Sequence, residues 1–303
     1  MGAVVVAQGA QGELVSRLQR YLEGLGLLMG GIDGRYGLDT SLAVRSFQAQ
    51  NALGVSGEAD PVTWTGITGD GVPPIRDRAL QVTAAFEGHG FGLAQGNFDG
   101  AGITWGIIGF TLRHGELGRI FEEAFAGDEI LVRKAFGPET DTFRGVLHKS
   151  LPEQLAWADQ VSLGKSRALL AEPWRSHFQA FGDEPAVQVI QIKHVTEDYF
   201  QPALETANRY GLASELGVSL CFDIHVQDGG VSPRAADAIK SKLDPAAPER
   251  DRRVLIAQSV AASALPAYRN DVASRKIALA TGGGQVHGRS YTLRNWGLDD
   301  SLA

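Results

Sequence analysis

Two carboxylic acids, Glu87 and Asp99, stand in chemically different settings. Glu87 ends a predicted helix over 77–87, directly after Phe86, whereas Asp99 lies in the polar, glycine-rich stretch 97–102. The negative end of the helix dipole and an apolar neighbour both disfavour a charge on Glu87, while a solvated loop leaves Asp99 ionised. Glycoside hydrolysis uses a pair of carboxyl groups, of which one is protonated and the other is ionised. The alternative is two ordinary solvated acids out of the 35 in the chain.

A second group of polar residues lies in 220–230, where Asp223, Gln227 and Asp228 precede two glycines. We predict that these three side chains form hydrogen bonds with a sugar. The alternative is a buried helix in which Asp223 pairs with an arginine, Arg275 or Arg269. A metal site is not predicted, because the seven histidines are scattered and no His-Glu-x-x-His pair or cysteine ligand set is present. No cofactor is predicted either.

Small and aromatic residues around Asp99 suggest how a sugar would be held. Trp105 is predicted to stack on a sugar ring, although core packing is the commoner role of tryptophan. Gly100, Gly102 and Gly106 would let a sugar approach the backbone closely.

Helical periodicity dominates the segments that must position these residues. Apolar residues recur at three-to-four spacing around 76–87, 115–126, 153–171, 185–209, 233–243 and 251–277. The stretch 102–111 breaks the pattern, and its glycines and β-branched residues suit a small hairpin or irregular strand. Leu80, Ala84 and Phe86 would face the core.

The first part of the chain reads as a separate unit. We expect a peptidoglycan-binding domain over 1–68, a linker over 69–75 rich in glycine and proline, and a catalytic domain over 76–303. The first domain should hold three short helices. The first carries Leu14, Leu18, Leu22 and Leu25 on one face, the second begins with a Thr40 cap and buries Ala43, Val44 and Phe47, and Asp60-Pro61 opens the third.

The residues of this unit carry a specific resemblance. Asp33-Gly34-Arg35-Tyr36-Gly37, with Gly37 expected at positive φ, follows the leucine-rich helix and precedes Phe47-Gln48 and Thr63-Trp64. Over about sixty residues this spacing resembles the peptidoglycan-binding type 1 domain. The resemblance implies a cell-wall glycan or stem-peptide ligand, with Asp33, Arg35, Tyr36 and Gln48 as candidate contacts. The alternative is that these residues only build the three-helix fold.

The segment after Asp99 carries a second resemblance. Asp99-Gly-Ala-Gly-Ile-Thr104-Trp-Gly-Ile-Ile-Gly-Phe110 resembles the catalytic segment of the chitosanases of glycoside hydrolase family 46. The resemblance implies a lysozyme-like α+β fold, mainly α, with two helical lobes and a small β element. It also implies that Glu87 is the general acid and Asp99 the general base, and that Thr104 holds the attacking water. Carboxyls roughly 6.5–9.5 Å apart would mean inversion, and roughly 5 Å would mean retention.

Composition narrows the class of protein. The chain has 303 residues, 44% hydrophobic and 21% charged, which is typical of a globular protein rather than a disordered one. Its net charge of −7 argues against nucleic-acid binding, and its single cysteine, Cys221, excludes an intrachain disulfide. No membrane segment is evident, and we expect a monomer. The start has no signal-peptide pattern, so we expect release through lysis, a holin or a secretion machine.

Three functions fit these residues. The first domain favours a peptidoglycan glycan-strand hydrolase of muramidase (lysozyme) type, as in a modular endolysin, since a wall anchor raises the effective concentration of the enzyme on its substrate. The catalytic motif and the acidic net charge favour a chitosanase, because chitosan is polycationic. A non-catalytic wall-binding protein is the third. We predict the first.

Overall fold

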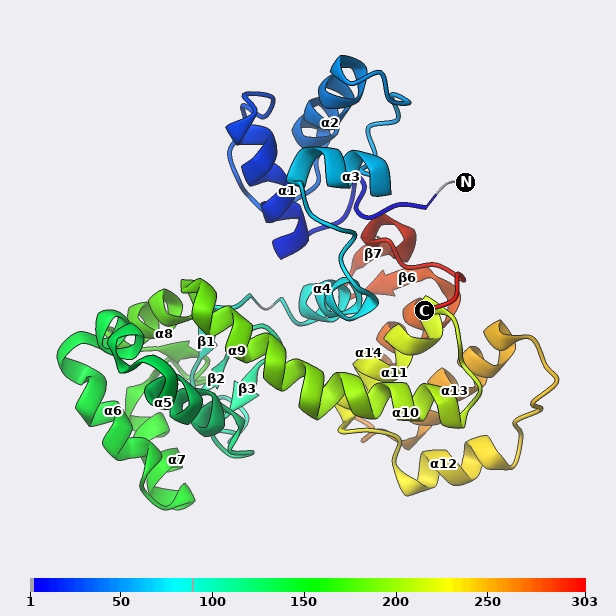
Figure 1. Cartoon of the computed structure of the whole chain (residues 1–303). Helices are drawn as coiled ribbons and strands as arrows, with labels where there is room; N and C mark the ends of the chain where they lie inside the picture. Colours follow the sequence, from blue (N-terminus) through cyan, green and yellow to red (C-terminus); the bar gives the residue numbers. More distant parts are fainter. Residues whose placement is uncertain (1–2, 89) are drawn as a thin grey trace. The chain divides into compact units, whose positions relative to one another are not determined.

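The computed structural model describes residues 3–88 and 90–303, which form mainly helices with three small antiparallel sheets (Figure 1). The predicted class, mainly α with a small β element, is confirmed. The chain divides into two compact units: unit 1 combines Met1–Phe86 with Asp198–Ala303, and unit 2 is Glu87–Glu197. The glycine- and proline-rich stretch 69–75 therefore lies inside unit 1 and does not separate the two units.

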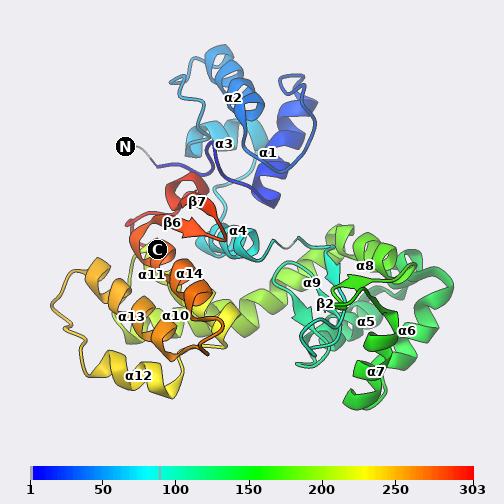
Figure 2. The same cartoon turned by 180° about the vertical axis from the view of Figure 1, so that it is seen from behind.

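Three short helices form the predicted bundle at the start of unit 1: α1 (Glu13–Gly24), α2 (Leu38–Gln50) and α3 (Pro61–Thr68) (Figures 1 and 2). Leu18, Leu22 and Val44 have no exposed surface, as their helical spacing predicts. Asp60 caps α3, since its carboxylate accepts a hydrogen bond from the amide of Thr63 at 2.7 Å.

Three details of this bundle differ from the prediction. Helix α2 begins at Leu38 with Gly37 as its N-cap, so Thr40 lies inside the helix and does not cap it. Gly37 has φ −89°, and the positive φ belongs to Gly34 at +68°, in the tight turn before it. Leu25 is 52% exposed because it lies beyond the last residue of α1.

The rest of unit 1 packs around helix α4 (Ile75–Glu87), which is buried on most sides. Its other elements are η2 (Thr196–Phe200), α10 (Gln201–Arg209), α11 (Glu215–Asp228), α12 (Pro233–Lys240), α13 (Glu249–Ser263), α14 (Arg269–Thr281), the hairpin β6 (Gly283–Val286) and β7 (Arg289–Thr292), and η3 (Leu293–Trp296). The helix predicted over 251–277 is two helices, with Pro266 in the break between α13 and α14.

The three-helix bundle is held to α4 and to the C-terminal segment by direct polar contacts. The backbone amide of Glu13, at the start of α1, donates to Oε1 of Gln81 on α4 at 2.5 Å. Arg294 of η3 forms a two-pronged ion pair with Glu58 at 2.9 and 3.0 Å, and this pair lowers the pKa of Glu58. The bundle is therefore part of the same compact unit as α4.

Unit 2 contains a three-stranded sheet and several helices. Its elements are β1 (Ala94–Gln95), β2 (Thr104–Trp105), β3 (Phe110–Thr111), α5 (Glu116–Phe136), η1 (Gly137–Glu139), α6 (Thr140–Leu147), α7 (Leu151–Val161), β4 (Ser162–Leu163), β5 (Leu169–Leu170), α8 (Trp174–Asp183) and α9 (Pro185–Val195). The β element predicted within 102–111 is confirmed as β2 and β3. The helix predicted over 153–171 ends at Val161, where the β4–β5 hairpin follows.

An aromatic cluster forms the core of unit 2. Its fully buried members are Trp105, Phe121, Phe136, Phe143, Phe178 and Phe181. The Trp105 ring lies 5.6 Å from the Phe121 ring and stacks on Phe181, and its Nε1 donates to the Phe178 carbonyl at 2.9 Å. These contacts fix strand β2 against α5 and α8. Across residues 3–88 and 90–303, no helix is long and apolar enough to cross a membrane.

Replacing Trp105 with alanine should destabilise the protein by about 3–5 kcal/mol, because a buried aromatic side chain leaves a cavity when it is truncated. Urea unfolding followed by circular dichroism measures this change. An unchanged free energy of unfolding combined with weaker substrate binding would contradict the core role.

Candidate functional site

The three predicted catalytic residues belong to one compact unit. Glu87, the last residue of α4, is the first residue of unit 2, and Asp99 and Thr104 lie further along the same unit. Glu87 is partly exposed. A group at this position can exchange a proton with a bound substrate.

Asp99 lies on the connection between β1 and β2 and is exposed to solvent. Its Oδ1 accepts a hydrogen bond from the amide of Ala101 at 2.9 Å, which closes an Asx turn. The sequence analysis missed the residue that holds this loop. Buried Asn97 accepts from the amide of Gly102 at 2.8 Å and donates to Asp159 at 2.7 Å. An asparagine just before an Asp-Gly turn is the sequence signal that could have predicted this role.

Thr104 opens strand β2, opposite Gln95 of β1 and Thr111 of β3. Because side chains alternate along a strand, Thr104 points away from the side on which Trp105 enters the aromatic core. Its hydroxyl is buried and has no hydrogen-bond partner within residues 3–88 and 90–303. Leaving a buried hydroxyl without a partner costs about 1–3 kcal/mol.

Two glycines of this region serve the packing of the protein rather than a sugar. Gly102 and Gly106 have φ of +84° and +91°, which favours glycine whatever lies nearby. A β-carbon on Gly106 would lie 2.6 Å from Oε1 of Gln191, the side chain that accepts from the amide of Ile107. The expectation that these glycines admit a sugar is wrong for both, because the protein itself fills the space next to them.

Trp105 cannot stack on a sugar ring. Its side chain has no exposed surface, and its faces and indole nitrogen are used within the aromatic core. The prediction that it binds substrate is therefore wrong, and its role is to anchor β2, which carries Thr104.

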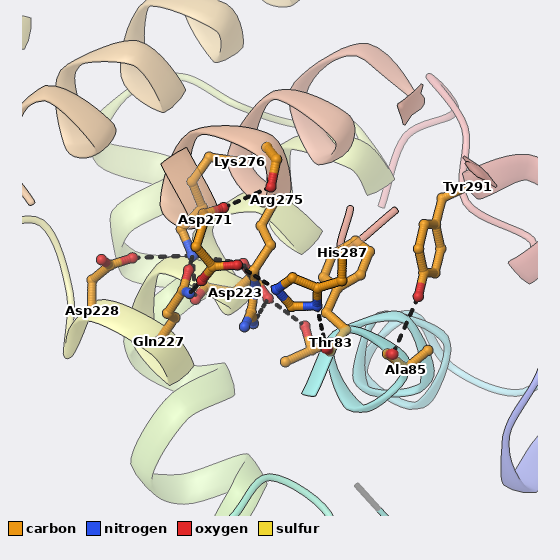
Figure 3. A network of polar contacts seen from close by, with 12 residues as sticks. Thr83, Ala85, Asp223, Gln227, Asp228, Asp271, Arg275, Lys276, His287 and Tyr291 are labelled. Carbon is orange, nitrogen blue, oxygen red and sulfur yellow. Dashed lines mark hydrogen bonds and ion pairs between the residues drawn. The ribbon is translucent and has the colours of Figure 1, made fainter. Parts of the chain in front are cut away.

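Asp223 is buried inside unit 1 and neutralised there (Figure 3). Its carboxylate lies 2.6 Å from both Arg275 and Lys276 on α14 and accepts from the Thr83 hydroxyl on α4 at 3.0 Å. Burial alone would raise the pKa of Asp223, but the two cations outweigh it and hold that pKa far below its usual range. The predicted sugar contact is wrong for Asp223, and the alternative pairing with Arg275 is confirmed.

Gln227 and Asp228 belong to the same network (Figure 3). Lys276 donates to Oε1 of Gln227 at 2.7 Å and lies 3.0 Å from Asp228, while Gln227 donates to Asp271 at 2.6 Å. The Asp228 side chain is 18% exposed, and this burial raises its pKa despite the nearby ammonium group. Both predicted sugar-binding side chains are thus engaged by unit 1 itself. No cluster of metal-ligating side chains occurs in the described part of the chain.

The four candidate contacts of the first domain divide into two kinds. Tyr36 and Gln48 are buried, with the Tyr36 hydroxyl bonded to the Gly57 carbonyl at 2.9 Å and the Gln48 amide satisfied by backbone and hydroxyl groups. Neither can reach a ligand, so those two predictions are wrong. Asp33 and Arg35 are exposed and line an open cavity of about 100 Å³.

This cavity lies where the turn 30–37 meets the start of α2. Buried Gln19 shapes its wall by donating to Asp33 and accepting from the amide of Gly34, both at 2.8 Å. The hydrogen bond from Gln19 lowers the pKa of Asp33. Leu38, 63% exposed, adds an apolar side, so the cavity offers an anion, a cation and a hydrophobic surface together.

Replacing Asp223 with asparagine should destabilise the protein by about 3–5 kcal/mol, because two buried cations lose their counter-charge. Its carboxylate has a lowered pKa in the folded protein. Its contribution is therefore complete above the unfolded value of about 3.9 and is lost as pH falls below it. Thermal unfolding across a pH series measures both effects. Equal acid sensitivity in the variant and the wild type would contradict this role.

The chain is similar in structure to a family 46 chitosanase from Gynuella sunshinyii in complex with chitotetraose, with 18% identity, coverage of 72% of this chain and 97% of that one, and a TM-score of 0.48. The chain is also similar to a mutant chitosanase from Bacillus subtilis MY002 in complex with six glucosamine units. The identity is 20%, the match covers 72% of this chain and 95% of that one, and the TM-score is 0.46. A TM-score below 0.5 does not by itself assign a fold. The chain has no match among curated proteins. Residues 11–66 match the family described as "Putative peptidoglycan binding domain", and this segment is a domain of that family.

Proposed function

We propose that this protein is a glycoside hydrolase of muramidase (lysozyme) type that cuts the glycan strands of bacterial peptidoglycan. The observation that carries the proposal is the attachment of the wall-binding segment to α4. Residues 11–66 match a peptidoglycan-binding family, and Glu13 at the start of α1 is bonded directly to Gln81 on α4. Helix α4 ends at the candidate acid, Glu87, so the wall-binding segment is bonded to the same helix that carries this acid.

The proposed chemistry uses the three residues of unit 2. Glu87 donates a proton to the glycosidic oxygen as the bond to the leaving sugar breaks. Asp99, exposed on its loop, takes a proton from the water that attacks the anomeric carbon. The Thr104 hydroxyl, which the described residues leave without a hydrogen-bond partner, holds that water. Attack by water inverts the configuration of the anomeric carbon.

A second candidate is hydrolysis of chitosan. The run from Asp99 to Phe110 resembles the family 46 chitosanases, and a net charge of −7 suits a polycationic polymer. The wall-binding segment favours peptidoglycan, because a dedicated binding domain is a more specific feature than net charge. On this proposal the protein acts at the bacterial cell wall.

Replacing Glu87 with glutamine should lower the rate of wall hydrolysis by about a thousandfold or more, since the amide cannot supply the proton. The measurement is the loss of turbidity of purified cell walls, run beside the release of reducing ends from chitosan. Glu123 on α5, which is paired with Lys193, provides a matched Glu→Gln control outside the proposed site.

Each outcome of this comparison separates the candidate functions. Wall clearing without chitosan cleavage supports the muramidase, and the reverse supports the chitosanase. A Glu87→Gln variant as active as the wild type would show that Glu87 takes no part in the reaction. A wild-type protein that binds walls and cleaves neither polymer would be a non-catalytic wall-binding protein.

Replacing Arg35 with alanine should weaken binding to purified walls about tenfold, because hydrogen bonds from a charged group contribute about 1.5–3 kcal/mol. Co-sedimentation with wall fragments measures the change. Arg45, an exposed arginine of α2 outside the cavity, gives an Arg→Ala control with the same loss of charge. Equal losses in both variants would point to general charge attraction rather than to the cavity.

A further inference from the structure

The C-terminal hairpin reaches back to the end of the helix that carries Glu87. Nδ1 of His287, in the turn between β6 and β7, lies 3.1 Å from the carbonyl oxygen of Phe86. The Tyr291 hydroxyl on β7 donates to the carbonyl of Ala85 at 3.2 Å (Figure 3). Carbonyls in the last turn of a helix have no partner within the helix. The two residues directly before Glu87 are therefore held by side chains about two hundred positions away in the sequence.

The imidazole ring of His287 touches an acceptor on each side. Its Nε2 makes a short contact with Oδ1 of Asp271 on α14. The other carboxylate oxygen of Asp271 accepts from Gln227. A backbone carbonyl is an acceptor only. The contact with Phe86 is therefore a hydrogen bond when Nδ1 of His287 carries a proton and donates it.

Among the described groups near the His287 ring, Asp271 is the charged group that contacts it. Helix α4 presents a backbone carbonyl to it. On α14, Arg275 lies 5.4 Å from the centre of the Phe86 ring, and Lys276 reaches Asp271 only through Gln227. Arg275 is paired with Asp223, and Lys276 is paired with both Asp223 and Asp228. Arg289, two residues along the hairpin, is exposed.

We propose that His287 is a positioning residue for Glu87, and that the hydrogen bond from its Nδ1 clamps the last turn of α4 in the geometry the reaction needs. This inference rests on the proposed role of Glu87 as the acid. An acid displaced by about 1 Å can cost about a hundredfold in rate, so a clamp on the preceding carbonyl acts on kcat rather than on substrate binding.

Two amide variants separate the two contacts. In His287→Asn the side-chain nitrogen stands near the position of Nδ1 and can still donate to the Phe86 carbonyl. In His287→Gln it stands near the position of Nε2 and reaches only Asp271. We expect His287→Asn to keep kcat within about threefold, and His287→Gln to lose about tenfold or more in kcat at an unchanged KM. His225, bonded to Thr206 elsewhere in unit 1, provides a His→Gln control.

The assay uses soluble fragments of whichever polymer the wild type cleaves, with thermal unfolding measured for each variant. A His287→Gln variant with wild-type kcat, beside an inactive Glu87→Gln variant, overturns the clamp and leaves the proposed function standing. An active Glu87→Gln variant overturns both. Nitrogen-15 NMR of the His287 ring gives a readout independent of activity. A proton on Nδ1 at the pH of maximal activity supports the clamp, and an Nδ1 without a proton there refutes it.

Discussion

A carboxylate that has no contact with solvent must be neutralised by the protein, and Asp223 imposes this condition on unit 1. Its partners, Arg275 and Lys276, come from α14, and Thr83 comes from α4, so one buried charge fixes three helices against one another. Removing the Asp223 carboxylate would leave buried Arg275 without its counter-charge, which is far more costly than losing a surface ion pair. Lys276 also donates a hydrogen bond to Gln227, and this network continues to the C-terminal hairpin.

In unit 2, apolar packing positions the candidate residues. The Trp105 side chain is enclosed by the aromatic cluster. Because side chains alternate along a strand, Thr104 then points to the opposite side. The Asp99 loop is held by the amide of Asn97 rather than by charge. The candidate acid ends a helix ordered by buried charges, whereas the other two candidate residues belong to a small sheet ordered by aromatic rings.

Local patterns predicted much of this structure from the sequence. The three-helix bundle, the Asp60 cap and the β element around Thr104 follow from periodicity, capping and glycine content, and all three are present. The predicted chemical roles were wrong for residues that are buried in the structure. Trp105 and Asp223 are core residues, and no single-sequence pattern distinguishes a buried tryptophan or a paired aspartate from an exposed one. The contact of His287 with α4 joins positions about two hundred apart, beyond the reach of any local pattern.

The contacts that bind the three-helix bundle to its surroundings bear on how such a chain is recombined. Arg294 holds Glu58, and the Trp296 indole donates to the backbone of Gln11 at 3.0 Å, so the final residues of the chain help to fasten its first domain. A chimera joined at the glycine- and proline-rich stretch 69–75, with a foreign anchor in front, would lose both of these attachments. Exchange of the anchor therefore requires the segment around η3 to be exchanged with it.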